Sequence, residues 1–245
     1  MISLCDDINM VKSAIEGLGG NRCIKGIMHL YLESYGVSYD FNQFYIQYCD
    51  HIPTALLHRY NTQVYVIASV SCDRDELLPF LKGFAGCQVI AAGFNFSDFV
   101  GAEECCVMSK FGEKIADLSS DIRECTDAKL ISELVCANEN KDKRTDFFLN
   151  TAHQLRYNKL KVKCYYKQDI PVCVASSTIL SPDSSVLTFV YTNEYFRGNG
   201  YMKKLLANIC DNHCKEYLLL CEKHNLPFYE KCGFKLNSRV LKFSL

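Results

Sequence analysis

The stretch that most constrains the fold of this chain is residues 186–204, VLTFVYTNEYFRGNGYMKK. It opens with six apolar or β-branched residues, 186–191, a pattern that predicts a buried strand. A polar turn with two glycines follows, and four apolar residues after it share one helical face: Met202, Leu205, Leu206 and Ile209. The first N–H groups of a helix lack intrahelical partners, and the helix dipole places partial positive charge there. A strand, a glycine turn and a helix start therefore predict an anion-binding site.

Two common phosphate-binding motifs do not match this turn. The dinucleotide motif needs a third glycine where this chain has Lys203, and the Walker loop spacing is absent. The turn reads Arg197-x-x-Gly200-x-Met202, which resembles the Arg/Gln-x-x-Gly-x-Gly/Ala cofactor loop of the GNAT superfamily, the N-acetyltransferases that use acetyl-CoA. Met202 departs from the small residue usual in the family. The departure matters if its side chain crowds the pyrophosphate, and matters little if only its N–H is used.

A second block resembles the same family. Residues 217–221, YLLLC, predict another buried strand, and residues 225–234, NLPFYEKCGF, are similar to a short helix ending in Tyr-Glu-Lys-x-Gly-Phe. Pro227 suits a first helical turn and Gly233 suits the position after the last one. The two blocks occupy the last quarter of the chain, and the resemblance covers roughly its C-terminal half.

The resemblance implies a mixed α+β GNAT fold, in which helices flank a central, mostly antiparallel sheet. In the family, free backbone groups at the end of the central strand pair with the pantetheine arm of the cofactor, and N–H groups of the loop hold the pyrophosphate. Residue by residue, the implied cofactor-binding set is Val190, Tyr191, Thr192, Arg197, Gly198, Asn199, Gly200, Tyr201, Met202 and Asn225. From the residues alone, the strand positions also fit a plain core strand, and Arg197 fits a solvated turn.

The resemblance implies Tyr229 as the general acid that protonates the departing thiolate. A tyrosine with an ordinary pKa of ~10 keeps its proton at pH 7, so it can donate it. The alternative is a core tyrosine on a short helix. Asn225 either hydrogen-bonds the pantetheine or caps its own helix. No Glu, Asp or His occurs in residues 186–191, so a general base is not predicted on the central strand.

The length of 245 residues suits two domains. We expect an N-terminal α/β domain in residues 1–115 and the GNAT domain in residues 116–245, joined by a linker near residues 112–120. The expected element order in the first half is also that of a GNAT core. The first half is therefore either a degenerate GNAT-like domain that has lost its cofactor loop or an unrelated α/β domain.

Local patterns predict the elements of the second half. We expect a helix capped by Thr126, a polar loop over residues 138–144 and a helix over residues 145–157. Strands follow at residues 161–166 and 172–180, before the central strand. In the first half, residues 55–59 and 63–70 predict a hairpin, while residues 41–50 are ambiguous.

Composition limits the classes of function. The net charge is -1, so the chain shows no general attraction to nucleic acid or to anionic membranes. The N-terminus has no signal peptide pattern and no stretch reaches ~18 continuous apolar residues, so we expect a cytoplasmic protein. The 15 cysteines then fit small buried residues in a reducing cell. Cys210, His213 and Cys214 are the nearest approach to a metal motif, and no metal is expected.

The resemblance implies an acetyl-CoA-dependent N-acetyltransferase that moves an acetyl group to a primary amine. Acetyl-CoA is the expected cosubstrate, and a small-molecule amine is the preferred acceptor because no acidic groove for a basic peptide is evident. Nucleic acid and membrane are not expected partners, and a homodimer is compatible with the sequence. The alternative is a non-catalytic acyl-CoA-binding sensor or a protein-interaction module on a GNAT shell. The missing base and Met202 fit that alternative, and activity with amines separates the two.

Overall fold

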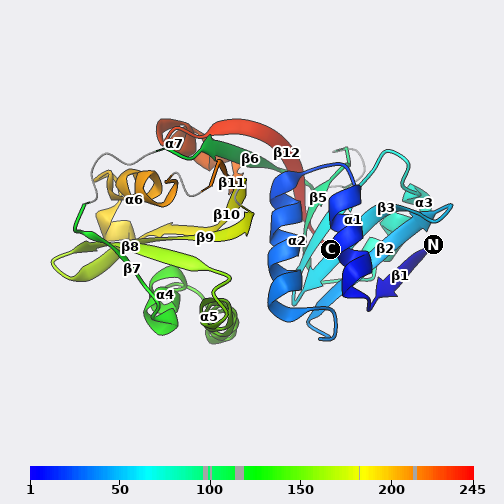
Figure 1. Cartoon of the computed structure of the whole chain (residues 1–245), viewed down its shortest axis with the longest axis horizontal. Helices are drawn as coiled ribbons and strands as arrows, with labels where there is room; N and C mark the ends of the chain where they lie inside the picture. The colour runs from blue at the N-terminus through cyan, green and yellow to red at the C-terminus, as the bar shows by residue number, and fades with distance from the viewer. Residues whose placement is uncertain (96–98, 100, 114–118, 182, 212–213) are drawn as a thin grey trace. The chain divides into compact units, whose positions relative to one another are not determined.

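The computed structural model describes residues 1–95, 99, 101–113, 119–181, 183–211 and 214–245 (Figure 1). The chain forms two compact units. Unit 1 consists of Met1–Val107, Cys221–Leu226 and Leu236–Leu245, and unit 2 consists of Met108–Leu220 and Pro227–Lys235. The expected linker falls largely on residues 114–118, which lie outside the described residues, so the boundary after residue 115 stays a prediction.

Unit 1 is built on a mixed sheet with the strand order β1-β2-β3-β4-β5-β12. Its strands are β1 (Ile2–Cys5), β2 (Asn42–Cys49), β3 (Ile52–Tyr60), β4 (Gln63–Ala68), β5 (Gln88–Ala92) and β12 (Lys235–Ser244). Its helices are α1 (Ile8–Gly17), α2 (Arg22–Tyr35) and α3 (Arg74–Lys82). Among the described strand pairs of unit 1, β4 and β5 run parallel, whereas Leu241–Ser244 of β12 pair antiparallel with β5.

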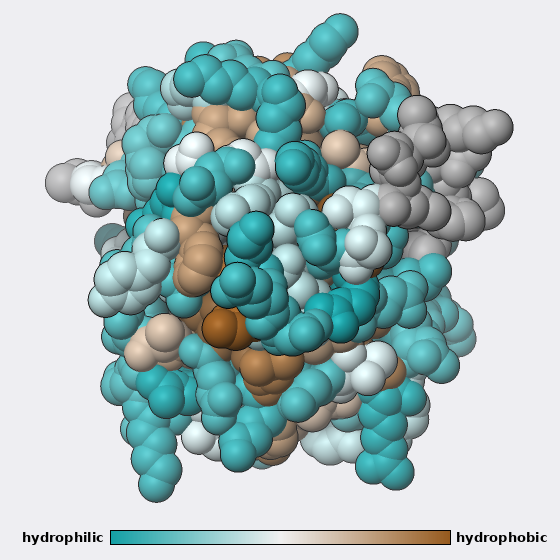
Figure 2. Space-filling model, turned by 90° about the vertical axis from the view of Figure 1, so that its left-hand side faces the viewer, coloured by the Kyte–Doolittle hydropathy of each residue, from teal (hydrophilic) through white to brown (hydrophobic). Residues whose placement is uncertain are grey.

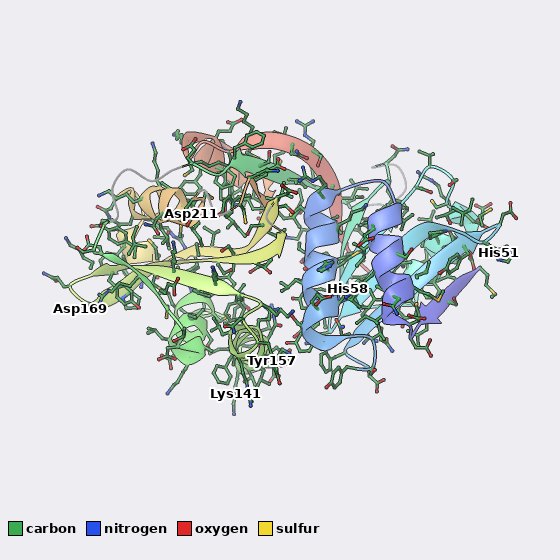
Figure 3. The ribbon with its side chains drawn as sticks, in the orientation of Figure 1. His51, His58, Lys141, Tyr157, Asp169 and Asp211 are labelled. Atoms are coloured by element: carbon green, nitrogen blue, oxygen red, sulfur yellow. The ribbon has the colours of Figure 1, made fainter. Side chains whose placement is uncertain are left out.

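Helices pack on both faces of the unit 1 sheet. Successive side chains of a strand point to opposite faces, so neighbouring residues of β3 contact different helices. Leu57 of β3 packs in a core with Leu77 and Leu81 of α3. The next residue, His58, faces α2 instead, where its ring lies 5.1 Å from that of Tyr31 (Figure 3). His58 is fully buried, and its Nε2 lies 2.8 Å from Oδ1 of Asn42.

Unit 2 contains the sheet order β11-β10-β9-β8-β7. Its strands are β7 (Ile122–Glu124), β8 (Lys161–Lys167), β9 (Ile170–Ser181), β10 (Ser184–Thr192) and β11 (Glu216–Glu222), and β6 (Glu103–Phe111) enters it from Met108. Its helices are α4 (Ala128–Val135), α5 (Lys141–Arg156), α6 (Tyr201–Ile209) and α7 (Leu226–Lys231), with the 3-10 helix η2 (Glu194–Phe196). A further 3-10 helix, η3 (Lys223–Asn225), belongs to unit 1.

In unit 2, α6 lies over one face of the sheet and α4 and α5 over the other (Figure 1). The core beneath α4 and α5 contains Ile131, Val162 and Val174, with Phe147 packed against it. Seen from the end that carries the β8–β9 turn, the surface is mostly hydrophilic and hydrophobic residues show in one limited area (Figure 2). This distribution is that of a folded unit whose apolar side chains are inside.

The mixed fold predicted from the sequence is confirmed, as is the hairpin of β3 and β4. Of the ambiguous residues 41–50, Asn42–Cys49 form β2. Two helix starts were wrong. Asp127, rather than Thr126, caps α4 by accepting from the N–H groups of Lys129 and Leu130. The expected loop at residues 138–144 instead contains the first turn of α5, because the Asn140 side chain caps it through the Lys143 N–H.

All 15 cysteines are free thiols, and Cys49 is the exposed one. The others are buried, as predicted for small apolar residues. Within the described part of the chain, no helix is long and apolar enough to cross a membrane.

Candidate active site

The two parallel strands of unit 2 separate partway along their length. Residues Ser184–Leu187 of β10 pair with Glu216–Leu219 of β11. Beyond the Leu187–Leu219 pair, the described residues of β10 and β11 form no further pairs, although β10 continues to Thr192. The edge of β10 that faces β11 is therefore unpaired beyond Leu187 in the described residues, and we call this unpaired edge the slot.

A bulge in β10 coincides with this separation. The register with β9 shifts between Leu187 and Val190, so that Thr188 and Phe189 both oppose Ser176. The Phe189 N–H donates to Oγ of Ser176 at 3.1 Å in place of a ladder bond. Bulges bend a strand and commonly end its pairing, which explains why β10 leaves β11 here.

Backbone groups of β10 face the slot without a strand partner. The N–H groups of Phe189 and Asn193 bond toward β9, to Ser176 Oγ and to Val172 O. Because backbone groups alternate along a strand, those of Val190 and Thr192 point the opposite way, into the slot. The Thr192 carbonyl already accepts from Arg197 Nε at 3.2 Å. The groups of Val190 remain available to an extended ligand.

The turn after β10 holds its shape through its own side chains. The Asn193 side chain accepts from the Tyr195 N–H at 3.1 Å, and Asn199 Nδ2 donates to the carbonyls of Phe196 and Arg197, each at 3.2 Å. Gly198 and Gly200 have φ values of 80° and 75°. Residues with a side chain rarely adopt these values, which accounts for both glycines. The Arg197 and Asn199 side chains thus shape the turn.

The helix that follows, α6, starts with free N–H groups. Gly200 is its N-cap and makes no side-chain cap, and the first turn carries no acidic residue. The first intrahelical bond runs from the Lys204 N–H to the Gly200 carbonyl at 3.2 Å. The N–H groups of Tyr201, Met202 and Lys203 precede it, so they have no intrahelical acceptor. This end of α6 offers donors and partial positive charge to an anion.

The side chains at the start of α6 leave that space open. Met202 is buried, with 5% of its surface exposed, so it packs into the unit and leaves its N–H at the turn. The Tyr201 ring stacks on Tyr165 with 4.8 Å between ring centroids, and Tyr165 donates to Asp121 at 3.0 Å. The departure of Met202 from the small residue of the family pattern therefore places no side chain before the helix end.

Tyr229 lies on α7 and is 8% exposed. Its ring meets those of Phe228 and Phe234 edge-on, at centroid distances of 5.1 and 5.7 Å. Its carbonyl accepts from the N–H groups of Cys232 and Phe234, both at 3.0 Å, and Gly233 ends the helix with φ 88°. The Tyr229 backbone is therefore firmly placed. Asn225 belongs to unit 1, where it is exposed at the end of η3, and its role stays a prediction.

The cysteines near these segments are not nucleophiles. Burial raises the pKa of Cys232, and it raises the pKa of Cys221 to about 12. Both thiols therefore keep their protons at neutral pH, whereas a thiolate is the reactive form. Within the described residues, no group of three or more His, Cys, Asp or Glu side chains is arranged to hold a metal ion.

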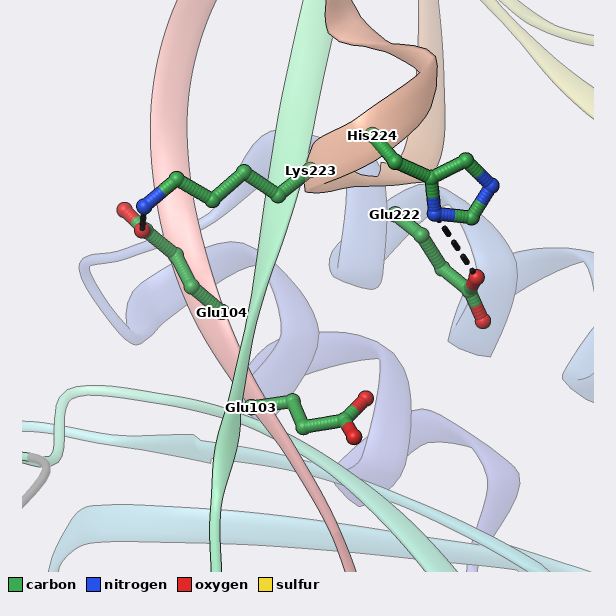
Figure 4. Close-up of a pocket in the computed structure, with 5 residues that line it drawn as sticks. All are labelled: Glu103, Glu104, Glu222, Lys223 and His224. Atoms are coloured by element: carbon green, nitrogen blue, oxygen red, sulfur yellow. Dashed lines mark ion pairs between the residues drawn. The ribbon is translucent and has the colours of Figure 1, made fainter.

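Unit 1 carries a separate open hollow of about 700 Å³ (Figure 4). Its lining is charged and consists of Glu103, Glu104, Glu222, Lys223 and His224. Lys223 pairs with Glu104 at 3.1 Å, and His224 Nδ1 lies 3.4 Å from Glu222 (Figure 4). None of these residues is in the set predicted from the sequence. The ion pairs among them offset part of their charge.

In unit 2 the structure brings most of the predicted cofactor-binding set together at one place. Val190 and Thr192 line the open edge of β10, and residues 197–202 form the turn and helix end that follow it. The Tyr191 side chain instead packs against the core beneath α4 and α5. The bulge, in which Thr188 and Phe189 oppose Ser176, was missed because a strand pattern gives no signal for a change of register.

The sequence profile of the acetyltransferase (GNAT) family matches residues 130–234. The fold is similar to a tandem GNAT protein from the clavulanic acid biosynthesis pathway, with a TM-score of 0.60 at 9% identity over 99% of this chain and 97% of that one. It is also similar to a Drosophila protein, with a TM-score of 0.66 at 11% identity over 99% and 98% of the two chains. A GNAT-family acetyltransferase from Colwellia psychrerythraea gives 0.59 at 10% identity over 99% and 98%. No curated protein matches the chain.

Proposed function

We propose that this chain, whose residues 130–234 match the acetyltransferase (GNAT) family and whose fold is similar to that of a tandem GNAT protein, transfers an acetyl group from acetyl-CoA to a primary amine. The observation that carries the proposal is the slot along β10, which opens beside the uncapped start of α6. An anion at the helix end and an extended arm along a free strand edge are what a CoA thioester presents.

The residues of unit 2 fit such a ligand. The N–H groups of Tyr201, Met202 and Lys203 suit a pyrophosphate, and the exposed side chains of Lys203 and Lys204 add positive charge on the same turn. The backbone groups of Val190 suit the amide groups of the pantetheine arm. We assign the cofactor contacts of this turn to backbone groups, with Arg197 and Asn199 as the side chains that hold its shape.

The reaction is then acyl transfer by direct attack. The amine nitrogen forms a bond to the thioester carbonyl carbon, and an electron pair moves to the carbonyl oxygen. When that pair returns, the carbon–sulfur bond breaks and the thiolate takes the proton of Tyr229. Since β10 carries no carboxylate or imidazole, the proton lost by the amine passes to water, and water returns a proton to the Tyr229 phenolate. Positioning and hydrogen bonds to the oxygen supply most of the catalysis.

The test is calorimetric titration with acetyl-CoA of the wild type and of Gly200→Glu. The glutamate places a carboxylate at the helix end, and we expect it to abolish binding. Gly86→Glu is the matched control, because Gly86 also has a positive φ, 80°, and open space around it, but lies in unit 1. The proposal requires that the wild type binds, that Gly86→Glu still binds and that Gly200→Glu does not. Absence of binding by the wild type would refute it.

A further inference from the structure

Two cysteines, Cys125 and Cys164, lie in the core beneath α4 and α5 of unit 2. Cys125 follows β7, and its N–H donates to the Val162 carbonyl at 2.9 Å, which extends the pairing of β7 with β8 by one residue. Cys164 is two residues from Val162 along β8, so both thiols lie on the same face of the sheet. The two side chains are free thiols and are hydrogen-bonded to each other.

The Cys125 sulfur accepts several hydrogen bonds. Its donors include the Cys164 thiol and the Asp127 backbone N–H, and the Tyr166 hydroxyl reaches it as well. Burial raises the pKa of Tyr166 to about 12, so the phenol keeps its proton and can donate it in a hydrogen bond. Donors that converge on one sulfur favour its negatively charged form.

These contacts make Cys125 the more acidic thiol of the pair. The hydrogen bond from Cys164 is the largest influence and lowers the pKa of Cys125, although burial and the Asp127 carboxylate act in the opposite direction. That carboxylate caps α4, so it is turned toward its own helix. The hydrogen bond to Cys125 and burial both raise the pKa of Cys164. One sulfur therefore carries the charge while the other keeps its proton, and the thiolate is the nucleophilic form.

Cys125 is also the thiol that a small oxidant meets first. Its exposed fraction is 5%, whereas that of Cys164 is 1%. Cys125 lies in the short connection between β7 and the Asp127 cap of α4. A connection of this kind can make the small backbone movement that a bond between the two sulfur atoms requires.

We propose that Cys125 and Cys164 are a peroxide-sensitive thiol pair, in which Cys125 is oxidised first and Cys164 then closes a disulfide. The Cys125 thiolate attacks one oxygen of hydrogen peroxide, the O–O bond breaks, and a sulfenic acid and hydroxide form. The Cys164 sulfur next attacks the Cys125 sulfur, and the S–O bond breaks. The hydroxyl group leaves with the Cys164 proton as water. The two sulfur atoms supply the two electrons that reduce the peroxide.

This inference does not depend on the proposed function, because it needs neither acetyl-CoA nor an amine. The direct test is peptide mapping by mass spectrometry of the folded, full-length protein after a short exposure to hydrogen peroxide. Remaining thiols are alkylated in denaturant before digestion. Cys136 is the matched control within the same protein, because it lies at the other end of α4 and is 6% exposed, but burial raises its pKa.

We expect a peptide in which Cys125 and Cys164 are linked, and a loss of the Cys125 thiol at least about 10-fold faster than that of Cys136. The proposal is overturned if no linked peptide forms, or if the two thiols are lost at the same rate. The wild-type experiment decides this even if a variant does not fold.

Two variants separate the roles within the pair. Cys164→Ser keeps a hydrogen-bond donor but cannot form the disulfide, so Cys125 should stop at the sulfenic acid, which dimedone traps as an adduct. Tyr166→Phe removes one donor and should slow the oxidation of Cys125 several-fold, while the rate at Cys136 stays the same. Dimedone adducts on Cys136 as abundant as those on Cys125 would contradict the assignment.

Discussion

The segment β4–α3–β5 of unit 1 and the segment β10–α6–β11 of unit 2 have the same topology. They differ in how far their parallel strands stay paired and in whether the helix start is free to accept an anion. Each joins two neighbouring parallel strands through a helix. In unit 1, β4 pairs with β5 from Gln63 through Ile67, almost to the end of the strand. In unit 2, pairing stops at Leu187 and β10 runs on alone to Thr192. The strands β4 and β5 therefore stay paired at the position where β10 and β11 separate.

The two helix starts differ in the same sense. Asp73 caps α3 by accepting from the Glu76 N–H at 3.1 Å, and Asp75 and Glu76 add negative charge to the first turn. A carboxylate thus already occupies the position that a phosphate would need, and further carboxylates repel one. The start of α6 has neither a side-chain cap nor an acidic residue.

The end of β5 shows how tightly the unit 1 segment is closed. A Cβ placed on Gly93 would lie 2.0 Å from the Ala68 carbonyl oxygen, so the two chain segments approach as closely as only glycine allows. The β4–α3–β5 segment of unit 1 therefore lacks the unpaired strand edge and the uncapped helix start of the β10–α6–β11 segment. Strand pairing and helix capping, rather than topology, therefore distinguish the two segments.

The largest effect is expected at Tyr229, which has no counterpart in unit 1, since residues 93–102 after β5 contain no tyrosine. Tyr229→Phe keeps the edge-on contacts with Phe228 and Phe234 and removes the proton donor. We expect kcat to fall about 100-fold or more, with acetyl-CoA affinity nearly unchanged. Steady-state kinetics together with calorimetry measure both quantities.

Tyr157→Phe is the control for this change, because Tyr157 is 56% exposed at the end of α5. It should leave both kcat and affinity as they are. Unchanged turnover in Tyr229→Phe would show that another group protonates the thiolate.

A smaller effect, on stability, distinguishes unit 1 from unit 2. Burial lowers the pKa of His58 to about 3, below its unfolded value of ~6.5. Between these two pH values the unfolded chain binds the extra proton, so stability is full above the unfolded pKa and is lost as the pH falls. The slope from His58 is at most ~1.4 kcal/mol per pH unit. Hydrogen exchange in urea, read separately for peptides of unit 1 and unit 2, should show that acid weakens unit 1.

His58→Gln isolates this contribution. Glutamine can still donate to Asn42 but does not titrate, so the variant should be less stable at pH 7.5 and should lose the His58 share of the slope. An identical acid sensitivity in the variant would assign the slope to other groups.

The smallest effect concerns the cap that closes the unit 1 helix. Asp73→Ala removes the bond to the Glu76 N–H and should lower the free energy of unfolding by ~1 kcal/mol. Acetyl-CoA affinity should not change. Asp127→Ala, which removes the corresponding cap of α4 in unit 2, is the matched variant for urea denaturation. A loss of acetyl-CoA affinity in Asp73→Ala would mean that unit 1 takes part in binding the cofactor, contrary to the comparison.

The sequence predicts those parts of the site that local chemistry determines. An apolar run, two glycines and a helical face lie within residues 186–204, and the structure confirms a strand, a turn with positive φ at both glycines, and a helix. Gly233 likewise ends α7 as its position predicts. Each of these features depends on residues close together in the chain.

Features that depend on distant residues leave no such local pattern in the sequence. The bulge exists because Ser176 on one strand bonds to Phe189 on the next, and the slot exists because β11 stops pairing after Leu219. Register of this kind is set by the whole sheet and not by any one strand. The start of α5 was missed for another reason: an exposed polar helix looks like a loop unless its cap, Asn140, is recognised.

Because β12 belongs to the unit 1 sheet, the completion of that sheet depends on the order in which the chain is synthesised. Leu241 and Phe243 pair with β5 and pack in the same core as Leu57 and Val89. In the chain, both residues come after every residue of unit 2. A ribosome must therefore finish unit 2 before the sheet of unit 1 can be completed, and until then the edge of β5 lacks its partner. Unit 1 begins first and is completed last, so during translation it is the part most exposed to wrong pairing and the part that chaperones would need to hold.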